Sequence, residues 1–133
     1  MGEQHQPEKR DYIRIQARLP VRYRFLKSGT GGMQALGTAS GETTNLSGGG
    51  LCLVGPIPDL DWVVELLMEK IAVWVEIEFP GAWKPVRAVT RVAWLEGLNE
   101  GTRVCSMGLR FKEITREAQD RILDYIIESQ LPP

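Results

Sequence analysis

The chain has 133 residues and a formal net charge of −1, and 43% of its residues are hydrophobic and 25% charged. These values are typical of one globular domain, and they argue against a polycation that binds nucleic acid polymers through net charge. No apolar run approaches the roughly 20 residues that span a bilayer, so we expect no membrane insertion. With one histidine, His5, and two cysteines, Cys52 and Cys105, the sequence predicts no histidine-based enzyme, no metal site and a reducing, cytoplasmic setting.

The chain begins with a polar segment and then becomes strand-like. Residues 1–9 have no periodic apolar positions, and we expect residues 1–18 to form a flexible leader before one folded domain over residues 19–133. Alternating apolar and polar side chains over residues 19–26 predict a half-buried strand. Glycine-rich turns are expected at residues 28–32 and 47–50, and a short helix over about residues 62–69, capped by Asp59 or Asp61. Further strands are predicted at residues 37–45, 51–54, 71–79, 86–95 and 102–111.

The last segment changes its period from two to nearly four. Ile114, Ala118, Ile122 and Ile126 recur at every fourth residue, which predicts an amphipathic helix over about residues 114–130. Thr115 is its expected N-cap. Six short strands followed by one helix predict an all-β fold, namely a six-stranded antiparallel β-barrel with a C-terminal α-helix docked on it.

Positive charge is concentrated near the start of the chain, where residues 8–27 hold seven Lys and Arg residues against two carboxylates. Such an arm indicates a compact anionic partner better than a long polyanion, but on charge alone a solvated strand face is the simpler explanation. Arg22 and Arg24 fall on the polar side of the first predicted strand, which is enough to explain them. Arg10 and Arg14 precede that strand with the spacing Arg-x-x-x-Arg, so two guanidinium groups can fold over a ligand and bind phosphate oxygens or a guanine edge. This spacing alone is common.

Residues 45–50 read Asn-Leu-Ser-Gly-Gly-Gly. On extended chain, Asn45 and Ser47 point to the same side, so their polar groups can converge on one ligand. The glycines permit positive φ and a close approach of the backbone to that ligand. A plain glycine-rich hairpin turn explains the same residues equally well. A Walker-type phosphate loop does not fit, because no Gly-Lys-Ser/Thr follows.

Together, Arg-x-x-x-Arg at residues 10–14 and Asn-x-Ser-x-x-Gly at residues 45–50 resemble the signature of the PilZ domain, the bacterial receptor module for cyclic di-GMP. The resemblance covers residues 9 to about 130. It implies the family's six-stranded barrel and a second-messenger receptor without catalytic activity. Four further stretches resemble later landmarks of the family in the expected order: residues 19–23, 49–51, 91–94 and 108–111.

The resemblance also implies which residues bind cyclic di-GMP. Arg10 and Arg14 would clasp the guanine edges and phosphates as the leader folds over the barrel. Asn45 and Ser47 would hydrogen-bond guanine or phosphate, and Gly50 would keep the turn in the shape that aims them. Position 45 more commonly holds Asp in the family, and a carboxylate accepts from the guanine N–H groups more strongly than an amide does. The asparagine therefore bears on affinity.

Lys9 and Trp94 are two further candidate contacts. Lys9 either touches a phosphate or is a solvated lysine. Trp94 either stacks on a base, a contact worth roughly 1–3 kcal/mol, or is a core or rim tryptophan. Cys52 and Cys105 are expected to be small buried side chains on strands.

The sequence thus predicts a receptor that orders its arginine leader on binding cyclic di-GMP and signals to an unidentified protein effector. One alternative is an interaction module of the same fold that does not use the nucleotide, and a ligand titration separates the two. An oligonucleotide-binding barrel would need a basic groove across several strands, whereas the cations here gather in the leader and first strand. An enzyme is the least favoured alternative, since no nucleophile or metal set accompanies the carboxylates.

Overall fold

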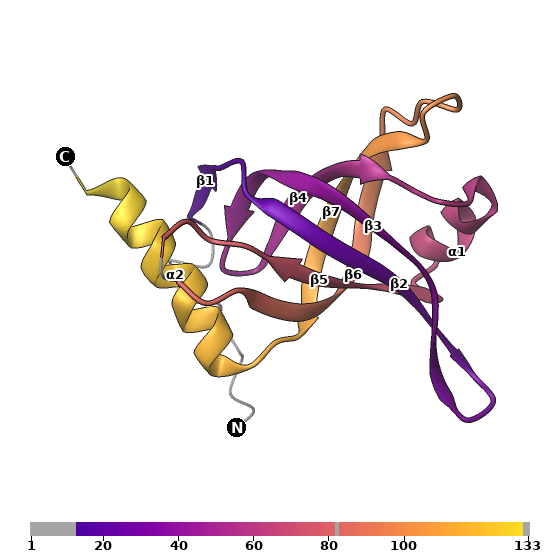
Figure 1. Ribbon diagram of the computed structural model, residues 1–133, viewed down its shortest axis with the longest axis horizontal. Coiled ribbons are helices and arrows are strands. Elements are labelled where there is room, and N and C mark those ends of the chain that lie inside the picture. Colours follow the sequence, from indigo (N-terminus) through magenta and orange to yellow (C-terminus); the bar gives the residue numbers. More distant parts are fainter. Residues whose placement is uncertain (1–12, 82, 132–133) are drawn as a thin grey trace, which may run out of the picture.

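The computed structural model describes residues 13–81 and 83–131. Within these residues, seven strands form one antiparallel sheet in the order β1-β3-β2-β5-β6-β7-β4, and β4 also pairs with β3 (Figure 1). Six strands therefore close into a barrel, as predicted, and β1 is added outside the ring against β3. The strands are β1 (Arg14–Gln16), β2 (Pro20–Gly29), β3 (Gly32–Ser47), β4 (Gly50–Pro56), β5 (Ile71–Ile77), β6 (Val86–Glu96) and β7 (Val104–Glu113).

Alternation places every second side chain of the ring strands inside the barrel. On β2, Tyr23 and Phe25 are buried, whereas the alternating residues Arg22 and Arg24 are exposed. This confirms the two faces predicted from the period of two. Other strands contribute inward side chains in the same way, and the core includes Leu46, Leu51, Leu53, Val73, Val75, Ile77, Val92, Met107 and Leu109.

The hairpin between β2 and β3 is longer than predicted. The sequence predicts a loop over residues 28–32, but the strands continue to a tight turn at residues 30–31. Positive φ angles of 91° at Gly31 and 115° at Gly32 let the chain reverse there. As a result, β3 begins at Gly32 instead of residue 37.

Residues 14–16, which the sequence places in the leader, form strand β1. They pair with residues 45–47 of β3, and Ile15 is buried in the core. One apolar side chain between two polar residues is too short a pattern for a periodicity argument, so the sequence does not reveal this strand.

The predicted short helix is divided into two parts. A 3-10 turn, η2 (Leu60–Trp62), leads into α1 (Val63–Leu67). The carboxylate of Asp59 accepts a hydrogen bond from the backbone N–H of Asp61, so Asp59 is the cap of this segment. Figure 1 shows α1 and the C-terminal helix at opposite ends of the barrel.

The C-terminal helix, α2 (Arg116–Gln130), packs its apolar stripe against the barrel. The hydroxyl of Thr115 accepts a hydrogen bond from the N–H of Ala118 at 3.1 Å, which confirms the predicted cap. No helix among the described residues is long and apolar enough to cross a bilayer. The buried side chains of α2 are Ala118, Ile122, Leu123 and Ile126.

Candidate functional site

Strand β1 carries Arg14 to the segment that the sequence predicts to bind a ligand. In the β1–β3 pair, Arg14 lies opposite Ser47. Ile15 and Leu46, the neighbouring residues on the two strands, are buried in the core. Arg14, Asn45 and Ser47 therefore share the outer face of the pair. There, Arg14 Nη1 donates a hydrogen bond to Asn45 Oδ1 at 2.5 Å, so the structure joins the two sequence elements.

The hydroxyl of Ser47 holds the turn between β3 and β4. Its Oγ donates to the carbonyl oxygen of Gly50 at 3.2 Å and accepts from the N–H of Gly49 at 3.3 Å. The residue is only 2% exposed. Its observed task is to set the shape of the turn beside Asn45, and its contact with a ligand stays a prediction.

Gly50 is required by the packing of two strands. It is the first residue of β4, lies opposite Arg110 of β7, and its φ is not positive. A Cβ at this position would lie 2.0 Å from the carbonyl oxygen of Leu109. The sequence assigns Gly50 to the conformation of the turn, whereas the structure shows that only glycine lets β4 approach β7 this closely.

Two further elements hold the same turn, and the sequence alone identifies neither. Gln119 of α2 donates through Nε2 to the carbonyl oxygen of Gly48 at 2.9 Å. The backbone N–H of Phe111 on β7 donates to the carbonyl oxygen of Gly49 at 3.0 Å. The C-terminal helix thus contacts the candidate site directly. The partners are too far apart in sequence for a local motif to reveal the contact.

Trp94 lies on the same outer face, three strands away from Asn45. The register runs from Trp94 through Gly108 and Cys52 to Asn45 across β6, β7, β4 and β3. At about 4.8 Å per strand, this places the two ends roughly 14 Å apart along the sheet. Trp94 is 41% exposed and rests on Gly108, where a Cβ would lie 2.2 Å from the indole Nε1. Trp94 is therefore a rim residue, outside the core.

The next row of this face carries two arginines that the sequence alone does not single out. Gly50 lies opposite Arg110, which in turn lies opposite Arg91. The guanidinium of Arg110 is 3.5 Å from the carboxylate of Glu69, and its side chain is 57% exposed. Exposed pairs of this kind are weak, so Arg110 keeps N–H donors for an anion. Arg110 belongs to the stretch 108–111 noted in the sequence, but only the register places it beside Gly50.

The remaining candidate residues and the titratable groups of the barrel complete the description of the site. Lys9 and Arg10, two of the predicted contacts, lie outside the described residues. Burial raises the pKa of the Cys105 thiol. Burial is also the main cause of the raised pKa of the Tyr23 hydroxyl, so both groups stay protonated and are poor nucleophiles. Within residues 13–81 and 83–131, no cluster of three or more His, Cys, Asp or Glu could hold a metal ion. The site offers hydrogen-bonding groups, positive charge and an aromatic surface.

Comparison with known proteins assigns the family. A sequence model of the PilZ domain matches residues 8–128, which is nearly the whole chain. The chain belongs to the PilZ domain family. No curated protein matches it.

Solved structures share the PilZ fold at low sequence identity. The inhibitor of motility MotI/DgrA of Bacillus subtilis has a TM-score of 0.65 and 19% identity, over 93% of this chain and 52% of its own. The PilZ domain of Escherichia coli YcgR, solved with c-di-GMP, has a TM-score of 0.57 and 13% identity, over 91% of both chains. PlzA of Borreliella burgdorferi, in complex with c-di-GMP, has a TM-score of 0.53 and 12% identity, over 94% of this chain and 55% of its own. The present chain thus spans about half the length of the first and third of these proteins.

Proposed function

We propose that this PilZ protein is a non-catalytic receptor for cyclic di-GMP. The observation that carries the proposal is the hydrogen bond from Arg14 to Asn45, which joins the two halves of the family signature on the outer face of the barrel. Membership of the PilZ family supports the choice of ligand, as do the two PilZ-fold structures that contain c-di-GMP.

Cyclic di-GMP presents two phosphates and two guanine bases, and the arginines match both. The guanidinium groups of Arg10 and Arg14 donate to phosphate oxygens or to guanine O6 and N7. Lys9 adds a donor to phosphate. Each hydrogen bond to a charged group contributes about 1.5–3 kcal/mol, which corresponds to roughly 10- to 150-fold in affinity.

The barrel surface supplies the remaining contacts. The amide of Asn45, which accepts from Arg14 in the structure, also accepts from the N–H groups of a guanine. Ser47 holds the turn in the shape that aims this amide, and its hydroxyl is a further group for guanine or phosphate. Gly50 lets β4 pack closely against β7 beside the turn. Trp94, with its exposed indole, stacks on a base at the far end of the row.

Ligand binding orders the leader that carries Lys9 and Arg10. Fixing the backbone costs about 1–2 kcal/mol per residue, and the charge-assisted hydrogen bonds to the ligand must exceed this cost. Strand β1 limits the cost, because pairing with β3 already positions Arg14. The ordered leader and the bound nucleotide then form a new surface for a protein effector in the cytoplasm.

Isothermal titration with cyclic di-GMP tests the proposal, with GTP and cyclic di-AMP as ligand controls. We expect saturable heat with cyclic di-GMP alone, and its stoichiometry gives one or two ligands per chain. Arg10→Ala combined with Arg14→Ala should abolish this heat. Arg116→Ala, which removes an exposed arginine at the start of α2, should leave it unchanged. Circular dichroism verifies that all variants fold.

Two results would contradict the proposal. Normal binding by the double variant would show that the arginines do not form the site. Absence of heat at high protein concentration would favour the nucleotide-independent interaction module.

A further inference from the structure

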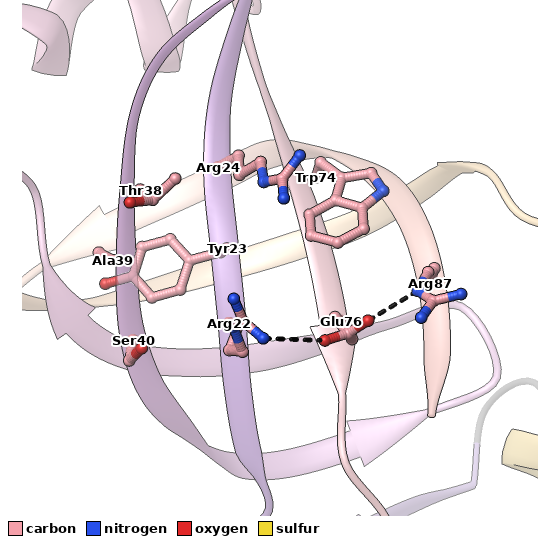
Figure 2. Close-up of a pocket in the computed structure, with 9 residues that line it drawn as sticks. All are labelled: Arg22, Tyr23, Arg24, Thr38, Ala39, Ser40, Trp74, Glu76 and Arg87. Atoms are coloured by element: carbon pink, nitrogen blue, oxygen red, sulfur yellow. Dashed lines mark hydrogen bonds and ion pairs between the residues drawn. The ribbon is translucent and has the colours of Figure 1, made fainter. Parts of the chain in front are cut away.

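A second polar surface covers the outside of β3, β2, β5 and β6, away from the nucleotide site. We call it the arginine cradle and define it by Arg22, Arg24, Trp74, Glu76 and Arg87 (Figure 2). Strand register arranges its side chains in two rows. One row is Ser40–Arg22–Glu76–Arg87, and the other is Thr38–Arg24–Trp74.

Two other side chains, Glu76 and Trp74, contact the three arginines of the cradle. Glu76, whose side chain is only 12% exposed, accepts a hydrogen bond from Arg87 Nε at 2.6 Å and lies 3.9 Å from Arg22 Nη1. The guanidinium of Arg24 lies 4.8 Å from the ring centroid of Trp74, a cation–π contact. Figure 2 shows Glu76 between Arg22 and Arg87. Arg24 and Arg87 are therefore oriented by direct contacts, and Arg22 keeps exposed N–H donors for a ligand.

The cradle carries an excess of positive charge that faces solvent. It has three guanidinium groups and one carboxylate, and the side chains of Arg22 and Arg87 are 68% and 65% exposed. Hydroxyls of Thr38 and Ser40 border a hollow of about 380 Å³. This volume is at the low end of the roughly 300–1,000 Å³ of small-molecule pockets, and most of the lining is polar. The chemistry fits an anionic, hydrogen-bonding group.

We propose that the arginine cradle binds an extended acidic segment of a partner protein, with Asp or Glu at alternate positions. Arg22 and Arg24 are two residues apart on a strand, which separates their Cα atoms by about 6.7 Å. Alternate side chains of an extended peptide have the same spacing, so two carboxylates meet two guanidinium groups one to one. A single phosphate has no such repeat, so it does not meet the two guanidinium groups one to one.

This binding does not depend on cyclic di-GMP. The cradle is centred on β2 and β5, and it shares only β3 and β6 with the nucleotide site, which also involves β1, β4 and β7. Ser40 and Asn45 are five residues apart on β3, or about 17 Å of extended chain. Both surfaces can be occupied at once, and either proposal can fail without the other.

Fluorescence anisotropy tests the cradle with a fluorescein-labelled decapeptide of alternating Glu and Thr. A block peptide of the same composition, with all Glu residues adjacent, controls for charge. The cradle variant is Arg22→Gln with Arg24→Gln. The matched control is Lys70→Gln with Lys84→Gln, which removes equal charge at two exposed positions outside the hollow. Unlabelled inorganic phosphate serves as competitor.

We expect the alternating peptide to bind more tightly than the block peptide. The cradle variant should weaken it about tenfold or more, and the control variant less than about twofold, with titration by cyclic di-GMP unchanged in both. Three outcomes would overturn the proposal: no saturable binding, equal binding of the two peptides, or equal losses in the two variants. Displacement by millimolar phosphate would also overturn it, and would identify an anion site.

Discussion

Replacing Gly50 with alanine tests how closely strands β4 and β7 pack. The new Cβ would lie 2.0 Å from the carbonyl oxygen of Leu109. Because a Cβ atom essentially never lies closer than 3.0 Å to another heavy atom outside its local chain, the two strands must separate by about 1 Å. This movement disturbs the pairing with Arg110 and the hydrogen bond from Phe111 to Gly49. Overpacking costs about 1–3 kcal/mol, and a lost backbone hydrogen bond about 1 kcal/mol. We expect the free energy of unfolding to fall by about 2–4 kcal/mol.

Urea denaturation followed by tryptophan fluorescence measures this loss. Thermal unfolding should show a decrease in Tm of roughly 6–16 °C, at about 3–4 °C per kcal/mol for a chain of this size. Gly49→Ala is the matched control, because its added Cβ meets nothing within 4 Å and its φ is not positive. It should change stability by less than about 0.5 kcal/mol. If both variants unfold at the same urea concentration, the packing argument for Gly50 is refuted.

Three further predictions concern single side chains. The buried hydroxyl of Tyr23 donates to a backbone carbonyl of β4 at 2.6 Å, so Tyr23→Phe should cost about 1–2 kcal/mol in urea denaturation. Burial raises the pKa of Tyr23, so above about pH 10 the unfolded chain releases this proton while the folded chain keeps it, and stability falls as pH rises. Tyr23→Phe should flatten this alkaline slope, and an unchanged slope would contradict the assignment. Asn45→Asp should increase the affinity for cyclic di-GMP measured by calorimetry, because a carboxylate is a stronger hydrogen-bond acceptor than an amide. A lower affinity would show that residue 45 does not accept hydrogen bonds from the ligand. Thr115→Ala should lower stability by about 1 kcal/mol through loss of the helix cap, and a variant as stable as the parent would show that the cap is not used.

Local patterns predicted the parts of the fold that depend on one segment at a time. The inward and outward faces of β5 follow from the period of two over residues 71–79, because a strand at the barrel wall must bury every second side chain. The stripe over residues 114–130 and the cap at Thr115 likewise placed α2 within two residues of its observed start. These signals are local, so tertiary structure did not alter them.

Features that depend on strand register were not accessible from the sequence. The sequence left open whether Trp94 stacks on a base or is a core or rim tryptophan. Its pairing with Gly108 and its exposed position exclude the core, whereas stacking on a base stays a prediction. The close approach of Leu109 to Gly50 is likewise a property of two strands together. Strand β1 forms only because it pairs with the end of β3, and a pattern of three residues is too short to predict that pairing.

The position of β1 outside the closed ring separates ligand sensitivity from stability. Every strand of the ring is paired on both sides, whereas β1 is held on one side through three residues. In native-state hydrogen exchange, the amides of β1 should open locally, while those of the ring exchange only when the barrel unfolds. If Arg14 binds the proposed ligand, substitutions at the exposed positions of β1 would change the ligand concentration that gives half-saturation, while the melting temperature of the barrel changes little because Ile15 stays in the core. In the proposed receptor, evolution can therefore adjust the ligand threshold without rebuilding the core.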